Sequence, residues 1–330
     1  MRLATFNLEN LDEPKSGDGP DLSTRVRALR PQLTRLDADL LCLQEVNAQD
    51  VPGGRRVFSA LDALLDDTPY ADYHRAATTN DKGTKPRDVQ NLVILSRWPI
   101  LQSRQYSHDL VPEPRYRPVT ARPAEKAARP VHWDRPILHA TIDLEFGDLG
   151  AGRRLELINL HLRAPLPAVI AGQKQAPFVW NSVGGWAEGT FLAAIKRAGQ
   201  ALETRLLIEQ LFDRDADAWI AVCGDFNADG REVPLKTIRG EVEETGNPAL
   251  ADRVLTPLEL SLPAKRRFTV RHYGERLMLD HIMVSRGLLA HFRGAEIHNE
   301  LLTDELVAFM TGRQDAESYH APVLARFELD

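Results

Sequence analysis

The feature of this sequence that most restricts its fold is a series of short apolar runs that each end in polar residues. A strand buried on both faces excludes a carboxylate unless that group is paired, bound to a metal or placed at the strand end. One such residue would be unremarkable, but the pattern recurs along the chain. It predicts that several strand ends meet in a shared site at one edge of the sheets. The polar residues at these ends are Asn7, Glu9, Gln44, Glu45, Asn159, His161, Asp225, Asn227, Asp280, His281 and His320.

Apolar runs of this kind predict strands at 3–8, 39–46, 71–77, 90–96, 136–144, 154–161, 219–224, 278–285 and 322–329. Helical spacing predicts helices over 22–36, 57–66 and 190–212. In the first helix we expect Ser23 to be the N-cap and Pro31 to delay the start or kink the helix. Long irregular stretches are expected at 109–135, which holds five prolines, and at 163–189. The order of elements indicates a mixed α and β fold around large sheets.

Composition narrows the function class. Lys and Arg total 41 against 47 Asp and Glu, a formal net charge of −6. This balance argues against tight, sequence-independent binding of nucleic acid over a large surface, but leaves a nucleic-acid substrate open. The two cysteines, Cys42 and Cys223, lie in apolar runs and are expected to be buried reduced thiols.

The sequence carries no signal for a membrane span or for export. No apolar run approaches the roughly 18 residues that a transmembrane helix needs, and the first residues lack an apolar signal core. We therefore expect a soluble, cytoplasmic protein, although a mature secreted chain would have the same features. No obligate protein partner is evident.

The residue types at the strand ends suit phosphate chemistry. Glutamate together with Asn or Asp oxygens forms a hard ligand set that suits Mg²⁺ or Mn²⁺. Cysteine is missing from the set and the histidines stand far apart, which argues against zinc. The chain also lacks the P-loop pattern and the Gly-x-Ser-x-Gly esterase elbow.

The segments FNLEN, LQEV, NLVILSRWP, NLHL, GDFN, LDHI and SYHAPV, in that order, resemble the endonuclease/exonuclease/phosphatase superfamily, which has the DNase I-like fold. The resemblance runs from Asn7 to about residue 327. It implies an α/β (α+β) sandwich of two sheets with outer helices. It also implies a single domain over 1–330, because motifs at both ends must meet in one site. It does not choose among members, which include DNA and RNA nucleases, inositol-phosphate phosphatases and sphingomyelinases.

The resemblance also implies roles for individual residues. Glu45 matches the main metal-binding glutamate, and Asn7 matches an asparagine that positions the metal or its water. The matches to catalytic residues are His161 at the scissile phosphate, Asp225 and Asn227 at the nucleophile and phosphate, and Asp280 as the partner of His320. Physical chemistry agrees, since a carboxylate can take the proton of the attacking water and an Asp–His pair favours the imidazolium. Candidate substrate contacts are Asn91, Arg163, Trp180 and Trp186.

One departure from the family pattern concerns the last motif, where Tyr319 stands at the usual aspartate. A neutral phenol is a poor ligand for Mg²⁺. We therefore expect either a single metal site centred on Glu45 with weakened binding, or another carboxylate in place of the aspartate.

The sequence thus predicts a hydrolase of phosphate esters that depends on Mg²⁺ or Mn²⁺, with DNA or RNA as the leading substrate class. One alternative is a phosphatase or phosphodiesterase acting on a small or lipid-linked phosphate. The other is a binding module that keeps the fold but has impaired catalysis.

Overall fold

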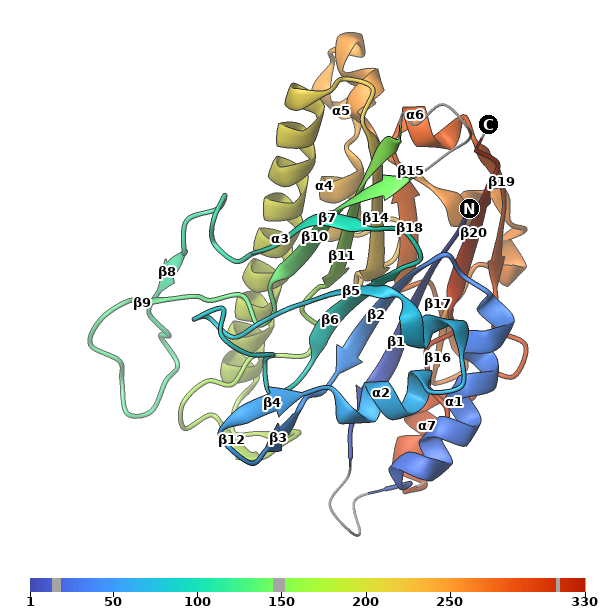
Figure 1. Cartoon of the computed structure of the whole chain (residues 1–330). Coiled ribbons are helices and arrows are strands. Elements are labelled where there is room, and N and C mark those ends of the chain that lie inside the picture. Colours follow the sequence, from blue (N-terminus) through green and yellow to red (C-terminus); the bar gives the residue numbers. More distant parts are fainter. Residues whose placement is uncertain (14–18, 145–151, 313–314, 330) are drawn as a thin grey trace.

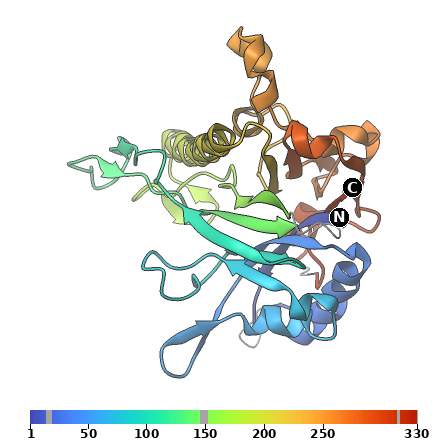
Figure 2. The same ribbon diagram turned by 45° about the horizontal axis from the view of Figure 1, so that its top comes forward.

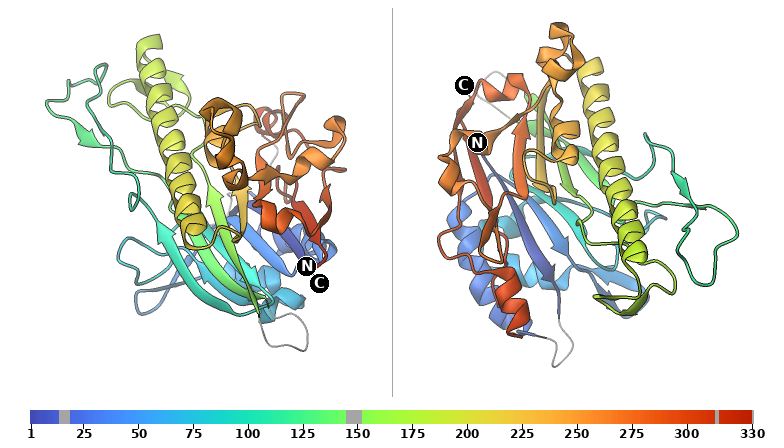
Figure 3. Two further views of the ribbon diagram at one scale, coloured as in Figure 1. Left: turned by 90° about the horizontal axis from the view of Figure 1, so that it is seen from above. Right: turned by 180° about the vertical axis from the view of Figure 1, so that it is seen from behind.

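The computed structural model describes residues 1–13, 19–144, 152–312 and 315–329. Two six-stranded mixed sheets pack face to face, and helices cover their outer faces (Figures 1 and 3). The first sheet has the strand order β19-β20-β1-β2-β6-β5, and the second has the order β15-β18-β14-β11-β10-β7. The expected two-sheet sandwich with outer helices is confirmed.

The first sheet contains β1 (Arg2–Leu11), β2 (Leu40–Val46), β5 (His74–Ala77), β6 (Asn91–Ser96), β19 (Phe292–Ile297) and β20 (Val323–Phe327). The second contains β7 (Ile100–Tyr106), β10 (Ile137–Leu144), β11 (Arg153–His161), β14 (Trp219–Asp225), β15 (Thr256–Pro257) and β18 (Asp280–Val284). Short pairs are β3 (Gln49–Val51) with β4 (Arg55–Val57), β8 (Arg115–Tyr116) with β9 (Arg129–Pro130), β12 (Lys174–Ala176) with β13 (Val179–Trp180), and β16 (Val270–His272) with β17 (Glu275–Leu277).

The α-helices are α1 (Leu22–Leu36), α2 (Ser59–Leu65), α3 (Val183–Arg214), α4 (Val233–Arg239), α5 (Val242–Thr245), α6 (Arg286–Leu289) and α7 (Glu305–Met310). Short 3₁₀ turns lie at Pro69–Asp72, Pro248–Arg253, Leu258–Ser261 and Ala264–Arg266. Helices α1 and α2 cover the outer face of the first sheet, and α3 runs along the outer face of the second (Figures 1 and 3). None of the helices in the described ranges is long and apolar enough to cross a membrane.

Strand alternation explains why polar residues gather between the sheets. In β1, Phe6 packs in the cluster under α1 and α2, whereas Leu3 packs between the two sheets. In β14, Cys223 also packs between the sheets. Because successive side chains point to opposite faces of a strand, Asn7 lies on the face of Leu3, and Asp225 lies on the face of Cys223. Both polar residues therefore point inward at the ends of their strands.

Helix α1 departs from the expectation at its start. Asp21 is the N-cap, and its side chain accepts a hydrogen bond from the Thr24 backbone N at 2.7 Å. Ser23 is not the cap, since its hydroxyl donates to Asp21 at 2.9 Å. The helix begins at Leu22 and continues through Pro31 to Leu36 as one unbroken helix.

Helix α3 begins inside the stretch that we expected to be irregular. Ser182 caps the helix, accepting from the Gly185 backbone N at 2.9 Å. Glycines weaken the helical signal here, because glycine is a poor helix former. Packing explains why residue 185 is a glycine, since a Cβ at Gly185 would lie 2.4 Å from Oε1 of Gln173.

The proline-rich segment 109–135 is long and mostly irregular, as expected, and projects beside α3 (Figure 2). Two glutamates of α3 hold it. The buried Glu203 carboxylate accepts from the backbone N atoms of His108 and Leu110 and from Nε1 of Trp133, at 3.0, 2.9 and 2.7 Å. Glu188 accepts in the same way from the part of the segment around Thr120. The segment is therefore anchored at two points to the helix.

Candidate active site

The two sheets bring together every residue that was expected to form the catalytic and metal site. From the first sheet come Asn7, where the regular pairing of β1 with β2 ends, Glu45, near the end of β2, and His320, which precedes β20. From the second come His161, Asp225 and Asp280, in β11, β14 and β18, and Asn227, which follows β14. Each sheet thus contributes about half of one group of side chains.

The buried Asp225 carboxylate lies at the centre of this group. Its Oδ2 accepts hydrogen bonds from Nδ2 of Asn7 and Nδ2 of Asn227, both at 3.1 Å, and lies 3.3 Å from Nε2 of His161. Its Oδ1 accepts from the Asn227 backbone N at 2.8 Å. Burial, together with the neighbouring Asp280, raises the pKa of Asp225 to about 7. The carboxylate can therefore accept a proton near neutral pH.

His320 and Asp280 form a buried pair beside Asp225. The Nδ1 of His320 lies 2.8 Å from Oδ2 of Asp280, and its Nε2 lies 4.0 Å from Oδ2 of Asp225. Burial lowers the pKa of His320, but Asp280 and Asp225 together raise it well above its usual range. His320 is therefore a cation that presents an N–H group toward Asp225.

His161, in contrast to His320, is an uncharged imidazole. Burial, the nearby Arg135 cation and His320 all lower the pKa of His161 well below its usual range. Its Nε2 lies 3.3 Å from Asp225 and 3.7 Å from Oε1 of Glu45. A neutral imidazole thus lies beside both carboxylates, with the same ring nitrogen facing them.

An irregular backbone aims Glu45 at the site. The pairing of β2 with β6 shifts register between Leu43 and Val46, and Glu45 has a φ of 58°. Such a bulge changes the direction of a side chain that regular alternation would send to the other face. The carboxylate accepts from Nδ2 of Asn7 and from the Asn10 backbone N, both at 3.1 Å.

Asn7 orients the carboxylates. Its amide nitrogen donates to Glu45 and Asp225, and its amide oxygen accepts from the Glu9 backbone N at 2.9 Å. In this arrangement the amide oxygen already has a partner. Direct metal ligation by Asn7 stays a prediction, whereas positioning of the two carboxylates follows from these contacts.

A divalent metal fits among Glu45, His161 and Asp225. Each offers a ligand atom, and these atoms all lie within 4.8 Å of one another. Within the described residues, neither carboxylate forms a salt bridge with a lysine or an arginine. The carboxylates of Glu45 and Asp225, which lack such a partner, supply hard oxygen ligands of the type that suits Mg²⁺ or Mn²⁺.

Glu9 is a further carboxylate beside Glu45; it was among the polar strand-end residues, but no catalytic or metal role was predicted for it. Its Oε2 accepts from the Tyr319 backbone N at 2.7 Å, and Glu9 has a φ of 51°. Burial raises the pKa of Glu9 to about 7, and the nearby Glu45 adds to this effect. Glu9 thus stands next to Tyr319, where the family pattern has an aspartate. The segment FNLEN contained the signal.

Comparison with known proteins identifies the family of the chain. The model of the Endonuclease/Exonuclease/phosphatase family matches residues 4–304. The chain belongs to this family. A sequence comparison with curated proteins gives no significant match.

Solved structures share the fold of this family member at low sequence identity. A mannosyl-6-phosphatase from Bacteroides thetaiotaomicron is 14% identical with a TM-score of 0.58, and 100% of each chain is covered. The 3′ phosphatase NExo from Neisseria, bound to a product DNA hairpin, is 18% identical with a TM-score of 0.51, again with 100% of each chain covered. A humanized TDP2 from D. rerio is 14% identical with a TM-score of 0.53, covering 100% of this chain and 99% of the other. These similarities establish the fold of the chain.

Arg135 is a second residue of this family member that sequence reasoning missed. Its buried guanidinium donates from Nε to Oε1 of Gln90 at 3.0 Å and from Nη1 to the Leu162 carbonyl at 3.4 Å. Burial lowers the pKa of Arg135, and the charges of Glu45 and Asp225 oppose that shift. Arginine remains protonated under these conditions, so Arg135 supplies a fixed cation beside the carboxylates.

Three of the four expected substrate contacts line one groove, and the fourth does not. Arg163, Trp180 and Trp186 lie along a hollow of about 790 Å³, called here the tryptophan groove. Lys174 also lines it, with Nζ 4.8 Å from the Trp180 ring centroid. Asn91 instead has a structural environment, because its amide binds the backbone of Val46 and Arg87 and the hydroxyl of Thr78.

A second hollow adjoins the tryptophan groove. This Phe309 cavity, of about 640 Å³, shares Leu166 and Phe178 with the groove. It begins at Glu9 and Tyr319, beside the catalytic group, and extends to α7. The two hollows therefore adjoin each other and are lined by different kinds of side chain.

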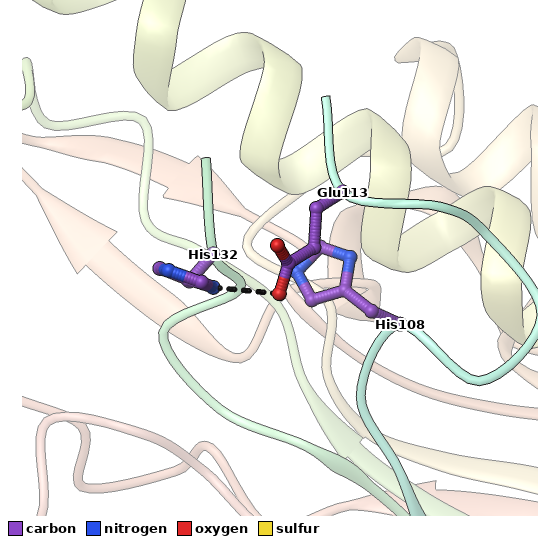
Figure 4. A group of neighbouring side chains, drawn as sticks. All are labelled: His108, Glu113 and His132. Carbon is purple, nitrogen blue, oxygen red and sulfur yellow. Dashed lines mark ion pairs between the residues drawn. The ribbon is translucent and has the colours of Figure 1, made fainter. Parts of the chain in front are cut away.

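His108, Glu113 and His132 form another cluster of ligand types, away from the catalytic group (Figure 4). Nδ1 of His132 lies 3.1 Å from Glu113, as the dashed line shows. Both ring nitrogens of His108 already have backbone partners, the Val111 carbonyl at 3.2 Å and the Trp133 N at 3.1 Å. The His108 ring also stacks on the Trp133 ring, with centroids 4.0 Å apart. We therefore interpret this cluster as part of the anchoring of the proline-rich segment.

Proposed function

We propose that this chain hydrolyses phosphodiester bonds with the help of a divalent metal ion, Mg²⁺ or Mn²⁺. The observation that carries the proposal is the group around Asp225, in which both sheets place carboxylates, imidazoles and amides within contact distance. The contributions of both sheets also support the inference that the chain forms a single catalytic domain.

The residues divide the work of an in-line displacement. Asp225, oriented by Asn7 and Asn227, takes the proton of the attacking water. His320, kept protonated by Asp280, donates to the phosphoryl oxygens as negative charge develops there, and Arg135 adds a second cation. A metal ion held by Glu45 and its neighbours would act as a Lewis acid and neutralise charge on the phosphate.

Replacement of the central carboxylate tests this proposal. Asp225→Asn is expected to lower turnover of bis(4-nitrophenyl) phosphate by roughly 10²- to 10⁴-fold with the fold preserved, because the proton acceptor is lost. EDTA should abolish the activity of the parent protein, and Mn²⁺ should restore it. If the variant cleaved as fast as the parent, the assigned mechanism would be wrong. A parent protein that folds and binds Mn²⁺ but turns over no phosphate ester would favour the binding-module alternative.

A nuclease is the second candidate, and the tryptophan groove favours it. Arg163 and Lys174 line this groove together with Trp180 and Trp186, and its described lining contains no carboxylate. Cations and exposed aromatic rings are the features that bind single-stranded nucleic acids. Cleavage of matched single-stranded DNA, duplex DNA and RNA, each assayed with Mn²⁺ and with Asp225→Asn as the control, would rank these substrates against bis(4-nitrophenyl) phosphate.

A further inference from the structure

The Phe309 cavity lies next to the catalytic group, because residues that line it adjoin Asn7, Glu45 and His320. Glu9 and Tyr319 form its inner end, and they are joined by the hydrogen bond from the Tyr319 backbone to the Glu9 carboxylate. Asn10, another lining residue, donates its backbone N–H to Glu45 at 3.1 Å. A group bonded to a phosphate at Glu45 would therefore lie next to this cavity.

The outer walls of the cavity are apolar and exposed. Phe178, in the turn between β12 and β13, meets Phe309 of α7, with ring centroids 5.8 Å apart and an interplanar angle of 74°. Even in contact, the two residues remain 70% and 66% exposed. Leu166, 58% exposed, and Leu306 add to the same walls. Large apolar side chains gathered in the open at one place mark a binding surface.

The charges in the cavity oppose an anionic occupant. Its described lining includes the acidic side chains of Glu9, Asp12, Glu305 and Asp315, against the guanidinium of Arg25 and the imidazole of His272. The Arg25 guanidinium already donates to the carbonyls of Leu8 and Glu9, and His272 lies 3.2 Å from Glu305. A second phosphate or a nucleic-acid backbone in this cavity would meet like charges.

We propose that the Phe309 cavity holds an apolar, non-anionic organic group that is esterified to the scissile phosphate. This inference rests on the proposed function and narrows it to phosphodiesters with an alkyl or aryl arm. Hydrolysis then adds water across one P–O bond, leaving one product with a P–OH group and one alcohol or phenol, and needs no further reactant. The tryptophan groove remains free for the other ester arm.

Non-hydrolysable phosphonates test the inference by binding alone. Calorimetry with Mn²⁺-loaded protein would compare methylphosphonate, hexylphosphonate and 6-phosphonohexanoic acid, whose tail ends in a carboxylate. Hexylphosphonate is expected to bind at least about tenfold more tightly than methylphosphonate, because its methylenes leave water. The carboxylate-ended tail is expected to lose that gain.

Single-residue variants test whether the preference for hexylphosphonate arises in the Phe309 cavity. Phe309→Ala and Phe178→Ala should reduce the preference for the hexyl chain, and both sites are exposed enough to leave the fold intact. Phe191→Ala, which removes a half-exposed phenylalanine that packs on Tyr116 elsewhere, is the matched control and should keep the preference. Equal binding of the methyl and hexyl compounds, or equal loss in all three variants, would overturn the inference. Failure of every phosphonate to bind, with no phosphodiester cleaved, would instead overturn the proposed function.

Discussion

At the scale of single residues, the site depends on backbone conformations that most side chains avoid. Glu9, Glu45 and Asn227 all have positive φ angles, at 51°, 58° and 46°. Such conformations cost free energy and persist where surrounding contacts enforce them, often at functional sites. At each of these positions the unusual backbone conformation turns a polar side chain, or the side chain of an adjacent residue, toward Asp225 or Glu45.

Glu9 is expected to contribute to metal binding in place of the aspartate that Tyr319 replaces. Glu9→Gln should weaken Mn²⁺ binding by roughly tenfold, as for other groups close to a metal. Tyr319→Asp should tighten it, because a carboxylate replaces a neutral phenol. Calorimetric titration with Mn²⁺ measures both. Asp12→Asn, which changes another carboxylate of the same cavity, is the control. Unchanged affinity in Glu9→Gln would exclude Glu9 from the metal site.

The sequence could identify His161, Asp225, Asn227, Asp280 and His320, because each stands beside an apolar strand within a recognisable segment. Glu9 was grouped with the polar strand ends but given no role, and Arg135 was not identified at all. The inward direction of Glu9 depends on a positive φ, and Arg135 depends on the path of the chain before β10. Neither property is encoded in a local pattern.

At the scale of elements, α3 does more than cover a sheet, since its glutamates hold the proline-rich segment. Glu203→Gln is expected to destabilise the protein by about 3 kcal/mol, because three donors lose a charged acceptor. Limited proteolysis should then cut the segment at its arginines faster than in the parent. Glu209→Gln changes a more exposed carboxylate on the same helix and serves as control. Unaltered proteolysis would show that other contacts hold the segment.

The buried pair of His281 and Glu259 should make stability depend on pH. His281 lies on the face of β18 opposite Asp280, with Nδ1 2.6 Å from Glu259 and Nε2 2.9 Å from the Ala228 carbonyl. Two acceptors require both nitrogens to be protonated. Burial lowers the pKa of His281, but Glu259 and the Ala228 carbonyl raise it by more than burial lowers it. The pKa therefore lies above its ordinary value.

The sign of the pH effect follows from that shift. Stabilisation by the imidazolium is fully present below about pH 6.5 and is lost as the pH rises through the higher folded pKa. Urea unfolding of the parent and of His281→Gln between pH 6 and 9 should therefore give curves that converge at high pH. A difference that stays constant across this range would contradict the assignment.

The central strands were predictable because they are continuous apolar runs, as in WIAVCG before Asp225. The edge strand β7 was not predicted, since only its last residue is buried and its sequence ILQSRQY is largely polar. The first turns of α3 were missed for a different reason, the glycines in them, of which Gly185 is required by packing against Gln173. Local patterns report burial and propensity, and they do not report close approach between distant segments.

At the scale of the whole molecule, a buried polar bridge ties the two sheets together behind the site. Nε2 of Gln44 donates to Oδ1 of Asn159 at 2.7 Å. Nδ2 of Asn159 donates across the interface to the carbonyls of Leu43 and Val93, both at 3.0 Å. These residues belong to the pattern of polar strand ends, and the structure gives them the task of joining the sheets.

Asn159→Leu should therefore affect stability and activity together. It leaves several buried polar groups without partners, at an expected cost of about 4 kcal/mol. It also removes a contact that aligns the two halves of the site, so turnover should fall in the folded variant. Asn247→Leu, at an exposed position, is the control. Full activity in a folded Asn159→Leu protein would show that the alignment does not depend on this bridge.

The division of the site between two sheets has an evolutionary consequence. A single-residue insertion within β14 would exchange its two faces, so Phe226 would point between the sheets and Asp225 toward α3. A single-residue insertion within a central strand is therefore expected to abolish catalysis. The turn that carries Phe178, helix α7 and the proline-rich segment lie outside those strands. These outer segments can therefore change in sequence and length without displacing the residues around Asp225.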